Sequence, residues 1–126
     1  MTIHEKLGIT IDTPHREKYG AVVKLIGLDN FARILPFSIE TLANKLKKDS
    51  NLNNIPLKEW DRIAGFSSYI TKTGEQKYIS HDSELKRLLQ SHGITCYSPA
   101  ELVCILKEAA TELVEEYTKE ALEPER

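Results

Sequence analysis

The sequence predicts an α+β fold that is mostly helical and winged helix-turn-helix-like, with a short central antiparallel sheet. Apolar residues recur at the spacing of amphipathic helices in several segments, which are separated by turns containing Pro, Gly or Asn. Two short segments on either side of Lys72-Thr73-Gly74-Glu75 are typical of a β-hairpin. With 126 residues, 40% of them hydrophobic, the chain can bury one core without a disulfide or a metal.

The first helix is expected to begin at Thr13-Pro14, because Thr is a good N-cap residue and Pro fits the first turn. It would extend to about Asp29 and turn inward the apolar residues Tyr19, Val22, Val23 and Ile26. Residues 1–12 lack clear periodicity and are expected to form an extended or partly ordered N-terminal arm. A short strand is predicted over residues 32–35, where Pro36 ends it.

Two further helices are predicted on either side of an Asn-rich turn at residues 50–54. The helix before the turn covers residues 39–48, with Ser38 as its N-cap. The helix after the turn begins at Pro56 and ends near Gly65. Its apolar residues share one face at helical spacing, and we expect this face to be buried: Leu57, Trp60, Ile63 and Ala64.

The hairpin strands are predicted at about residues 67–71 and 76–80. Tyr69 and Tyr78 are expected to face each other across the two strands. The order of elements up to residue 80 is helix, short strand, helix, turn, helix and hairpin. This is the order of a winged helix-turn-helix domain, in which the third helix enters the major groove of DNA and the hairpin is the wing.

The rest of the chain predicts a helix–strand–helix half. Ser80 or Asp82 would cap a helix to about Ser91, and a short strand would follow at residues 94–97. Ser98 and Glu101 have the spacing of a capping box, which predicts a helix from Pro99. Its stripe of Leu102, Leu106, Ala109, Leu113 and Tyr117 could pack on the chain itself or on a second copy, so both monomer and homodimer stay open.

These elements divide one compact body into three regions: the arm at 1–12, the winged half at 13–80, and a second half at 81–126 that ends in an acidic helix. A shift of 60 residues aligns 25–47 with 85–107 and reveals a weak internal repeat. Seven residues of the first segment are then identical to their counterparts: Leu25, Leu28, Ile34, Ser38, Leu42, Leu46 and Lys47. Either a pseudo-twofold duplication or shared secondary structure would produce this pattern.

Charge is unevenly distributed along the chain. Residues 1–80 hold 12 Lys/Arg and 9 Asp/Glu, whereas residues 81–126 hold 5 Lys/Arg and 10 Asp/Glu. The acidity therefore comes from the last helix, and the first two thirds is mildly basic. A mildly basic half is compatible with a DNA-binding face, and an acidic helix is compatible with a solvated surface or a protein-binding arm.

Several classes of function lack their sequence signals. The chain contains no phosphate-binding loop, no dinucleotide fingerprint, no nucleophile elbow and no zinc-protease motif. The four histidines do not fall at metal-ligand spacing. We therefore expect no enzyme activity, no catalytic residue, no metal and no cofactor. The chain has only two cysteines, which favours a cytoplasmic protein. It has no apolar run near the ~20 residues of a membrane span, so we expect no membrane partner.

The candidate DNA-binding residues lie on and around the third helix. Lys58 and Arg62 are four residues apart and share a helix face, where they could reach the groove. Cations and amides on the preceding helix end, the turn and the hairpin could contact phosphates or base edges. The full predicted set is Lys45, Lys48, Asn51, Asn53, Asn54, Lys58, Arg62, Lys72, Thr73 and Lys77.

Each of these residues also has a structural interpretation. Lysines at a helix C-terminus complement the helix dipole, and asparagines satisfy turn geometry. Glu59 and Asp61 lie beside Lys58 and Arg62, so the third helix is expected to be mixed in sign.

One stretch resembles a known group of proteins. Residues Leu52-Asn53-Asn54-Ile55-Pro56-Leu57-Lys58-Glu59-Trp60-Asp61 and Ala64-Gly65-Phe66, preceded by Ile34-Leu35-Pro36-Phe37-Ser38, are similar to small proteins of conjugative plasmids and transposons of Gram-positive bacteria. Among them, the chain resembles the TraN-like transfer accessory proteins, which have tandem helix-turn-helix halves and bind DNA near the transfer origin. The resemblance implies a relaxosome or regulatory role. The second half shows no evident wing or second recognition helix.

The sequence leaves two functions open. The first is a double-stranded DNA-binding accessory or regulatory protein of a mobile element, which would work with relaxosome or other mobile-element proteins. The second is a protein-interaction module that recruits or inhibits a partner enzyme through the acidic C-terminal helix. They differ in one spatial prediction: DNA binding requires the cations to converge on one face of the molecule.

Overall fold

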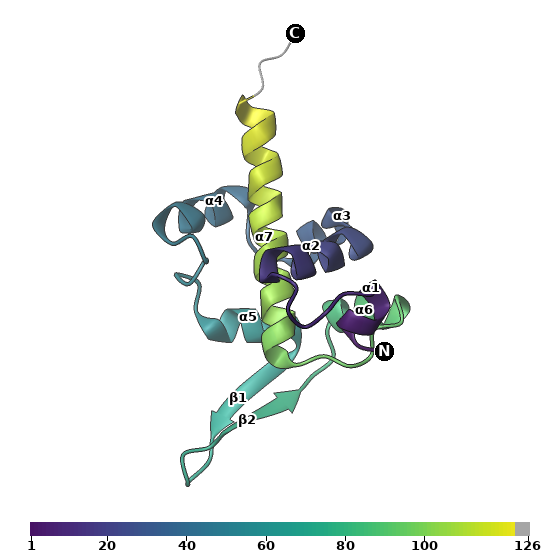
Figure 1. Cartoon of the computed structure of the whole chain (residues 1–126). Coiled ribbons are helices and arrows are strands. Elements are labelled where there is room, and N and C mark those ends of the chain that lie inside the picture. Colours follow the sequence, from purple (N-terminus) through teal and green to yellow (C-terminus); the bar gives the residue numbers. More distant parts are fainter. Residues whose placement is uncertain (123–126) are drawn as a thin grey trace.

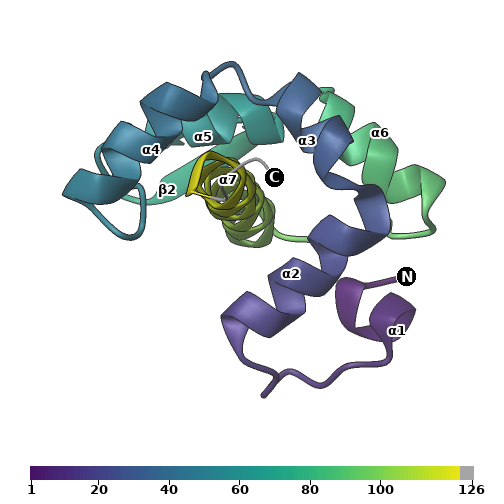
Figure 2. The ribbon, with the colours of Figure 1, turned by 90° about the horizontal axis from the view of Figure 1, so that it is seen from above.

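A computed structural model describes residues 1–122 and has a mostly helical α+β fold, as predicted. One long helix, α7, runs through the molecule, and α2, α3, α4 and α5 pack around it (Figures 1 and 2). The described part comprises α1 (Ile3–Leu7), α2 (His15–Ile26), α3 (Leu28–Ile34), α4 (Ile39–Lys48), α5 (Leu57–Ala64), β1 (Phe66–Ile70), β2 (Gln76–Ser80), α6 (Glu84–Ser91) and α7 (Pro99–Leu122).

Helix α7 forms the core of the fold. Its predicted capping box is present: Ser98 Oγ accepts from the Glu101 amide at 3.2 Å, and Glu101 Oε1 accepts from the Ser98 amide at 3.1 Å. The predicted stripe packs on the chain's own helices, with Leu102, Leu106, Ala109 and Leu113 buried and only Tyr117 exposed. Further α7 residues are buried outside the stripe, because neighbouring helices cover the helix from several sides: Val103, Ile105, Ala110 and Val114.

The N-terminal residues contain a helix packed on the core, and do not form the extended or partly ordered arm that we expected. Thr2 caps α1, whose Ile3 is fully buried in the core. The terminal amino group of Met1 donates to Thr95 Oγ1 at 2.9 Å, and Thr2 forms a single parallel bridge with Cys96. The strand predicted at 94–97 is reduced to this one bridge, because only the chain end lies beside it.

The prediction of a helix to Asp29 and a strand at 32–35 is wrong. Helix α2 ends at Ile26, and after Gly27, with φ of 100°, a new helix α3 runs in a different direction (Figure 2). The Asn30 side chain donates to the Ile26 carbonyl at 2.8 Å, so this carbonyl at the end of α2 has a hydrogen-bond partner. Phe31 and Leu35, four residues apart, are both buried, which is a helical spacing that the short apolar run concealed.

The sheet contains two antiparallel strands in the described residues, β1 and β2, and it is peripheral and not central. The hairpin extends away from the helices below the body in Figure 1. Tyr69 pairs with Lys77, and Ser68 pairs with Tyr78. The two tyrosines therefore point to opposite faces, and the expected Tyr69–Tyr78 pair is wrong by one position of register. Tyr78 packs edge-on against Phe66, at 6.4 Å between ring centroids.

The two segments of the weak repeat share only part of their structure. Ser38 and Ser98 both cap helices, α4 and α7. Upstream of these caps the segments differ, because residues 28–34 are helical whereas 88–94 contain the end of α6 and an irregular segment. The cap of α6 is Ser83, whose Oγ accepts from the Lys86 amide at 3.2 Å, and neither Ser80 nor Asp82.

Candidate nucleic-acid interface

Helix α5 has one buried and one outward face. Trp60 and Ala64 are fully buried against the core, and Asp61, only 5% exposed, lies beside them. Leu57 shares this angular face but is 57% exposed, contrary to prediction, because it lies in the first turn at the end of α5 that points away from α7 (Figure 1). Ile63 is half-buried at the edge of the face.

The outward face of α5 carries Lys58, Glu59 and Arg62. Arg62 Nη2 lies 2.7 Å from Glu59 Oε2, and Lys58 is exposed without an ion pair to any described residue. We expected Asp61 to add a second negative charge here, but it lies on the buried face, where desolvation raises the pKa of its carboxyl group. The outward face therefore has two cations against one carboxylate.

The turn between α4 and α5 is held by Asp49. Its carboxylate accepts from the backbone amides of Asn51 at 2.9 Å and Asn53 at 3.0 Å. Leu52 anchors the turn in the core and is fully buried at a left-handed φ of 59°. The Asn-rich segment is thus a defined turn, although at residues 49–56 it is longer than that of most helix-turn-helix motifs.

The predicted asparagines do not all gather beside α5. Asn51 and Asn53 line a hollow of about 500 Å³ on the α2 side, together with Arg16 and Tyr19, and Lys107 of α7 donates to Asn53 Oδ1 at 3.1 Å. Asn54 is exposed.

The same hollow is lined by two titratable groups that carry a proton at neutral pH, a tyrosine and a cysteine. Burial raises the pKa of Tyr19 to about 12 and also raises the pKa of the Cys104 thiol. Because a nucleophilic cysteine must be a thiolate, the geometry gives Cys104 no such character.

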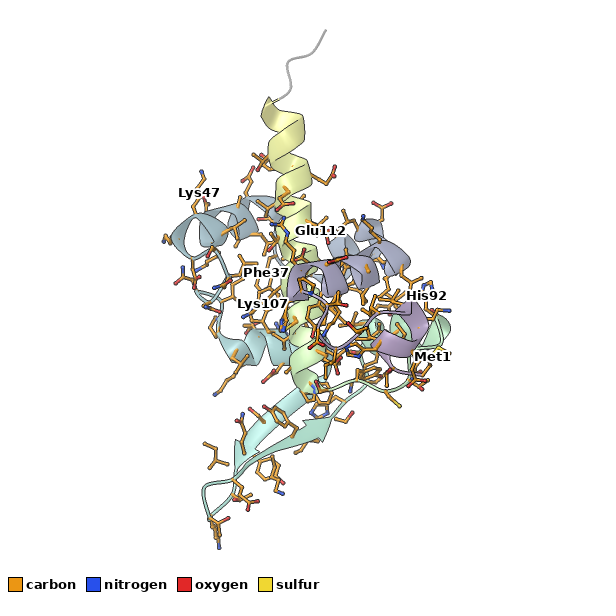
Figure 3. All side chains as sticks on the ribbon, in the orientation of Figure 1. Met1, Phe37, Lys47, His92, Lys107 and Glu112 are labelled. Atoms are coloured by element: carbon orange, nitrogen blue, oxygen red, sulfur yellow. The ribbon has the colours of Figure 1, made fainter. Side chains whose placement is uncertain are left out.

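The end of α4 carries the predicted lysines. Lys48 is exposed and Lys45 is half-buried. Lys47, which we did not include in the predicted site, lines a different hollow with Leu46 and Val114. It lies at the C-terminal end of α4 (Figure 3). The hairpin residues are all near its tip: Lys77 pairs with Glu75 at 3.4 Å, and Thr73 Oγ1 lies 3.0 Å from Thr71 Oγ1. Lys72 makes no ion pair within residues 1–122.

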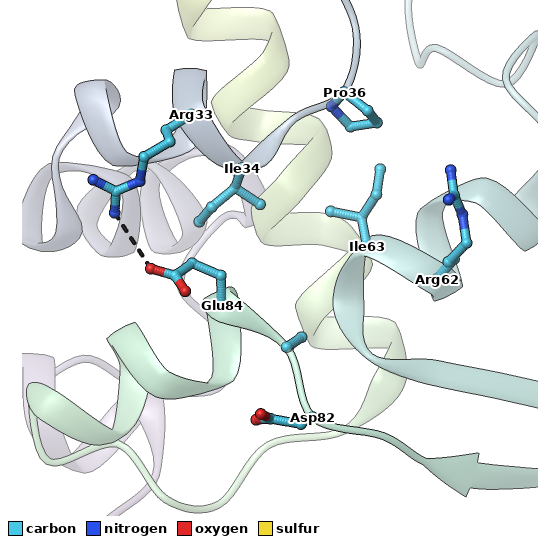
Figure 4. A pocket seen from close by; sticks show the side chains of 8 residues that line it. Arg33, Ile34, Pro36, Arg62, Ile63, Asp82 and Glu84 are labelled. Atoms are coloured by element: carbon cyan, nitrogen blue, oxygen red, sulfur yellow. Dashed lines mark hydrogen bonds and ion pairs between the residues drawn. The ribbon is translucent and has the colours of Figure 1, made fainter.

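Arg62 borders a hollow of about 540 Å³ between α3, α5 and the start of α6 (Figure 4). Ile34, Pro36 and Ile63 form its apolar wall. On the far side, Arg33 Nη2 pairs with Glu84 Oε1 at 3.3 Å. Arg33 is a cation that sequence reasoning missed, because residues 32–35 were expected to form a strand and Arg33 shares no motif with Arg62.

Three acidic residues of α7 line a hollow against α2. Arg16 pairs with Glu115 and lies 3.7 Å from Glu108, and these residues line a hollow of about 520 Å³ with Glu112. Burial raises the pKa of Glu108 and of Glu112, and their mutual repulsion raises that of Glu112 further. Figure 3 shows Glu112 and Lys107 on α7, and Figure 2 shows that α2 lies across α7 from α5. The predicted acidic segment continues to Glu125, and its residues 123–126 lie outside the described part.

Comparison with known proteins gives no match, since no family model, no curated protein and no solved structure is detectably similar to this chain. The described residues contain no cluster of His, Cys, Asp or Glu able to hold a metal ion. None of the helices within residues 1–122 combines the length and the apolar character needed to cross a membrane.

Proposed function

We propose that this chain binds double-stranded DNA through the outward face of α5, with the β1–β2 hairpin as a wing. The observation that carries the proposal is the position of Asp61. Because this carboxyl group is buried against the core, the outward face of α5 presents Lys58 and Arg62 against Glu59 alone. An exposed helix face with cations four residues apart fits the major groove, where Arg and Lys contact bases and phosphates.

The elements next to α5 support this surface. Only Gly65 separates α5 from β1, so the hairpin starts where the helix ends, and its tip carries Lys72 and Lys77. Lys48 lies at the end of α4, on the other side of the turn. Arg33, which is paired with Glu84, lies across the hollow from Arg62. We include Arg33 in the proposed interface, and assign Asn51 and Asn53 to the turn because they face α2.

Three acidic groups of α7 support the proposal, because they lie away from the outward face of α5. Glu108, Glu112 and Glu115 line the hollow against α2, which lies across α7 from α5. A DNA duplex on the outward face of α5 would therefore not meet them, and their repulsion for phosphates would be weakened by distance and salt.

The chain differs from a standard winged helix-turn-helix in two respects: the third strand is missing in the described residues, and the turn is long. The suggested cellular role rests on the sequence resemblance alone. It is that of an accessory or regulatory protein of a mobile element, acting near a transfer origin with relaxosome proteins.

The test is a fluorescence-anisotropy titration with two short labelled duplexes, one from DNA flanking the protein's own gene and one unrelated, at two salt concentrations. We expect salt-sensitive binding that is tighter for the native duplex. Arg62→Ala should lose about 1–3 kcal/mol of binding free energy. Lys6→Ala is the matched control, because Lys6 is an exposed cation on α1. Failure to bind either duplex at low salt, or equal loss in both variants, would overturn the proposal.

A second candidate follows from the α2–α7 hollow. Glu108, Glu112 and Glu115 could bind a basic segment of a partner protein, as expected for an interaction module that recruits or inhibits an enzyme. If DNA binding is absent, titration with an arginine-rich peptide against wild type and Glu112→Gln tests this alternative. Equal affinity of the two proteins for the peptide would exclude the hollow.

A further inference from the structure

The hairpin has almost no support beyond its base. Every residue of β1 and β2 except Phe66 is exposed, including Tyr69, Ile70 and Tyr78. Both faces of the hairpin therefore meet solvent, and no other element packs along it in Figure 1. The direction in which the hairpin leaves the body must then be fixed at its base, where the chain enters β1 and leaves β2.

Lys86 of α6 occupies this base. Its side chain is buried, with the residue 7% exposed. The ammonium group has three donors, and each has an acceptor: the Gly65 carbonyl at 2.8 Å, Ser80 Oγ at 2.7 Å and the His81 carbonyl at 2.7 Å. The same nitrogen lies 4.0 Å from the centroid of the Phe66 ring, in cation–π geometry.

These acceptors come from both ends of the hairpin. Gly65 ends α5 and precedes β1, Ser80 is the last residue of β2, and His81 follows it. Two other bonds join α5 to this segment: the His81 amide donates to the Gly65 carbonyl at 2.8 Å, and Ser83 Oγ donates to the Ala64 carbonyl at 3.1 Å. Lys86 is the side chain whose charged group binds the end of α5 and the end of β2 at once.

We propose that Lys86 is a positioning residue that sets the direction of the hairpin relative to α5, so that the wing and the outward face of α5 can contact one DNA duplex. Its part in DNA binding rests on the proposed function. Its part in the hairpin's direction does not, because that follows from the bonds at the base.

The first test is structural and uses no DNA. Lys86→Met keeps the apolar stem and removes the three donors. Residual dipolar couplings of backbone amides would report the orientation of residues 66–80 relative to the helices. Lys18→Met is the matched control, because Lys18 is also a buried lysine, 5% exposed, but lies on α2 and donates only to the Ile11 carbonyl at 3.5 Å. We expect the hairpin couplings to depart from the wild-type geometry in Lys86→Met and to keep it in Lys18→Met.

The second test is a double-mutant cycle on DNA binding. In the wild-type background, Lys72→Ala should flatten the dependence of log affinity on log salt by about 0.9 for one lost phosphate contact. In the Lys86→Met background the same change should have no effect, because the tip no longer reaches the duplex. If Lys86 only stabilised the fold, Lys72→Ala would flatten the salt dependence equally in both backgrounds.

The outcomes separate the two proposals. Unchanged hairpin couplings in folded Lys86→Met would overturn the positioning role whatever the DNA result. A displaced hairpin with an unchanged Lys72→Ala effect would overturn the link to DNA binding. If the wild type binds no DNA, the proposed function fails, and the residual dipolar couplings alone test whether Lys86 sets the direction of the hairpin. Should Lys86→Met fail to fold, Ser80→Ala, which removes one of the three acceptors, must give a smaller shift of the same couplings.

Discussion

The amide of His81 donates a hydrogen bond of 2.8 Å to the carbonyl of Gly65, and this bond closes the base of the hairpin. The approach is close because Gly65 has no side chain. A Cβ at this position would lie 2.8 Å from the His81 carbonyl oxygen and 2.9 Å from Ser83 Cβ. Gly65 also has a φ of 91°, a conformation that other residues adopt at a cost.

We predict that Gly65→Ala destabilises the protein by more than the backbone conformation alone would cause. The left-handed conformation costs about 1–2 kcal/mol, and the close contacts with His81 and Ser83 add to it because they involve backbone and a short side chain. Gly74→Ala is the control: its φ is 86°, but nothing lies within 4 Å of the added Cβ. Urea unfolding of both variants measures the difference, and an equal loss in both would show that the base tolerates the methyl group.

A second prediction concerns the ion pair between Glu59 and Arg62. Glu59→Gln frees the Arg62 guanidinium and removes the negative charge from the outward face of α5. Since an exposed pair is worth at most about 1 kcal/mol, we expect DNA affinity to rise by about two- to fivefold, with a steeper salt dependence. Glu17→Gln on α2 removes the same charge from another face. Anisotropy titrations compare the two, and an equal rise in both would indicate net charge alone.

The sequence predicted the elements that local signals define. Capping residues identified α4 through Ser38 and α7 through Ser98 and Glu101, and the Gly-containing turn identified the hairpin. It did not predict α3, because a short apolar run has no clear period and Gly27 allowed a break that the pattern did not reveal. The predicted pairing of Tyr69 with Tyr78 was wrong because the register depends on where the turn closes. A shift of one residue moves a side chain to the other face of the hairpin.

For the candidate site, the sequence predicted only the features that depend on residues close together in the chain. The i,i+4 spacing correctly placed Lys58 and Arg62 on one face of α5. Asp61 was assigned to the wrong side, because an acidic residue is expected to be exposed and only the tertiary packing of α5 buries it. Arg33 and Lys86 were missed, because their neighbours Glu84, Gly65 and Ser80 are distant in sequence or belong to different elements.

A third prediction follows from the half-buried carboxyl group of Glu112. One of its oxygens is buried and has no hydrogen-bond partner. Desolvation raises its pKa, the carboxylates of Glu108 and Glu115 raise it further, and Lys24 and Arg16 lower it less. The folded protein therefore holds this proton more tightly than the unfolded chain. As pH rises through the window from the unfolded pKa to the folded pKa, the folded state loses stability.

Glu112→Gln removes the charge and keeps the shape of the side chain. We expect the variant to be more stable than the wild type at neutral pH, where the wild-type carboxylate is charged and poorly solvated. The gain should vanish below about pH 4, where the glutamate is protonated in both states. Thermal unfolding followed by circular dichroism across this range measures it, with Glu116→Gln, an exposed residue of the same helix, as the control. A gain that persists at acidic pH would mean that the amide forms new hydrogen bonds, and that burial of the charge is not the cause.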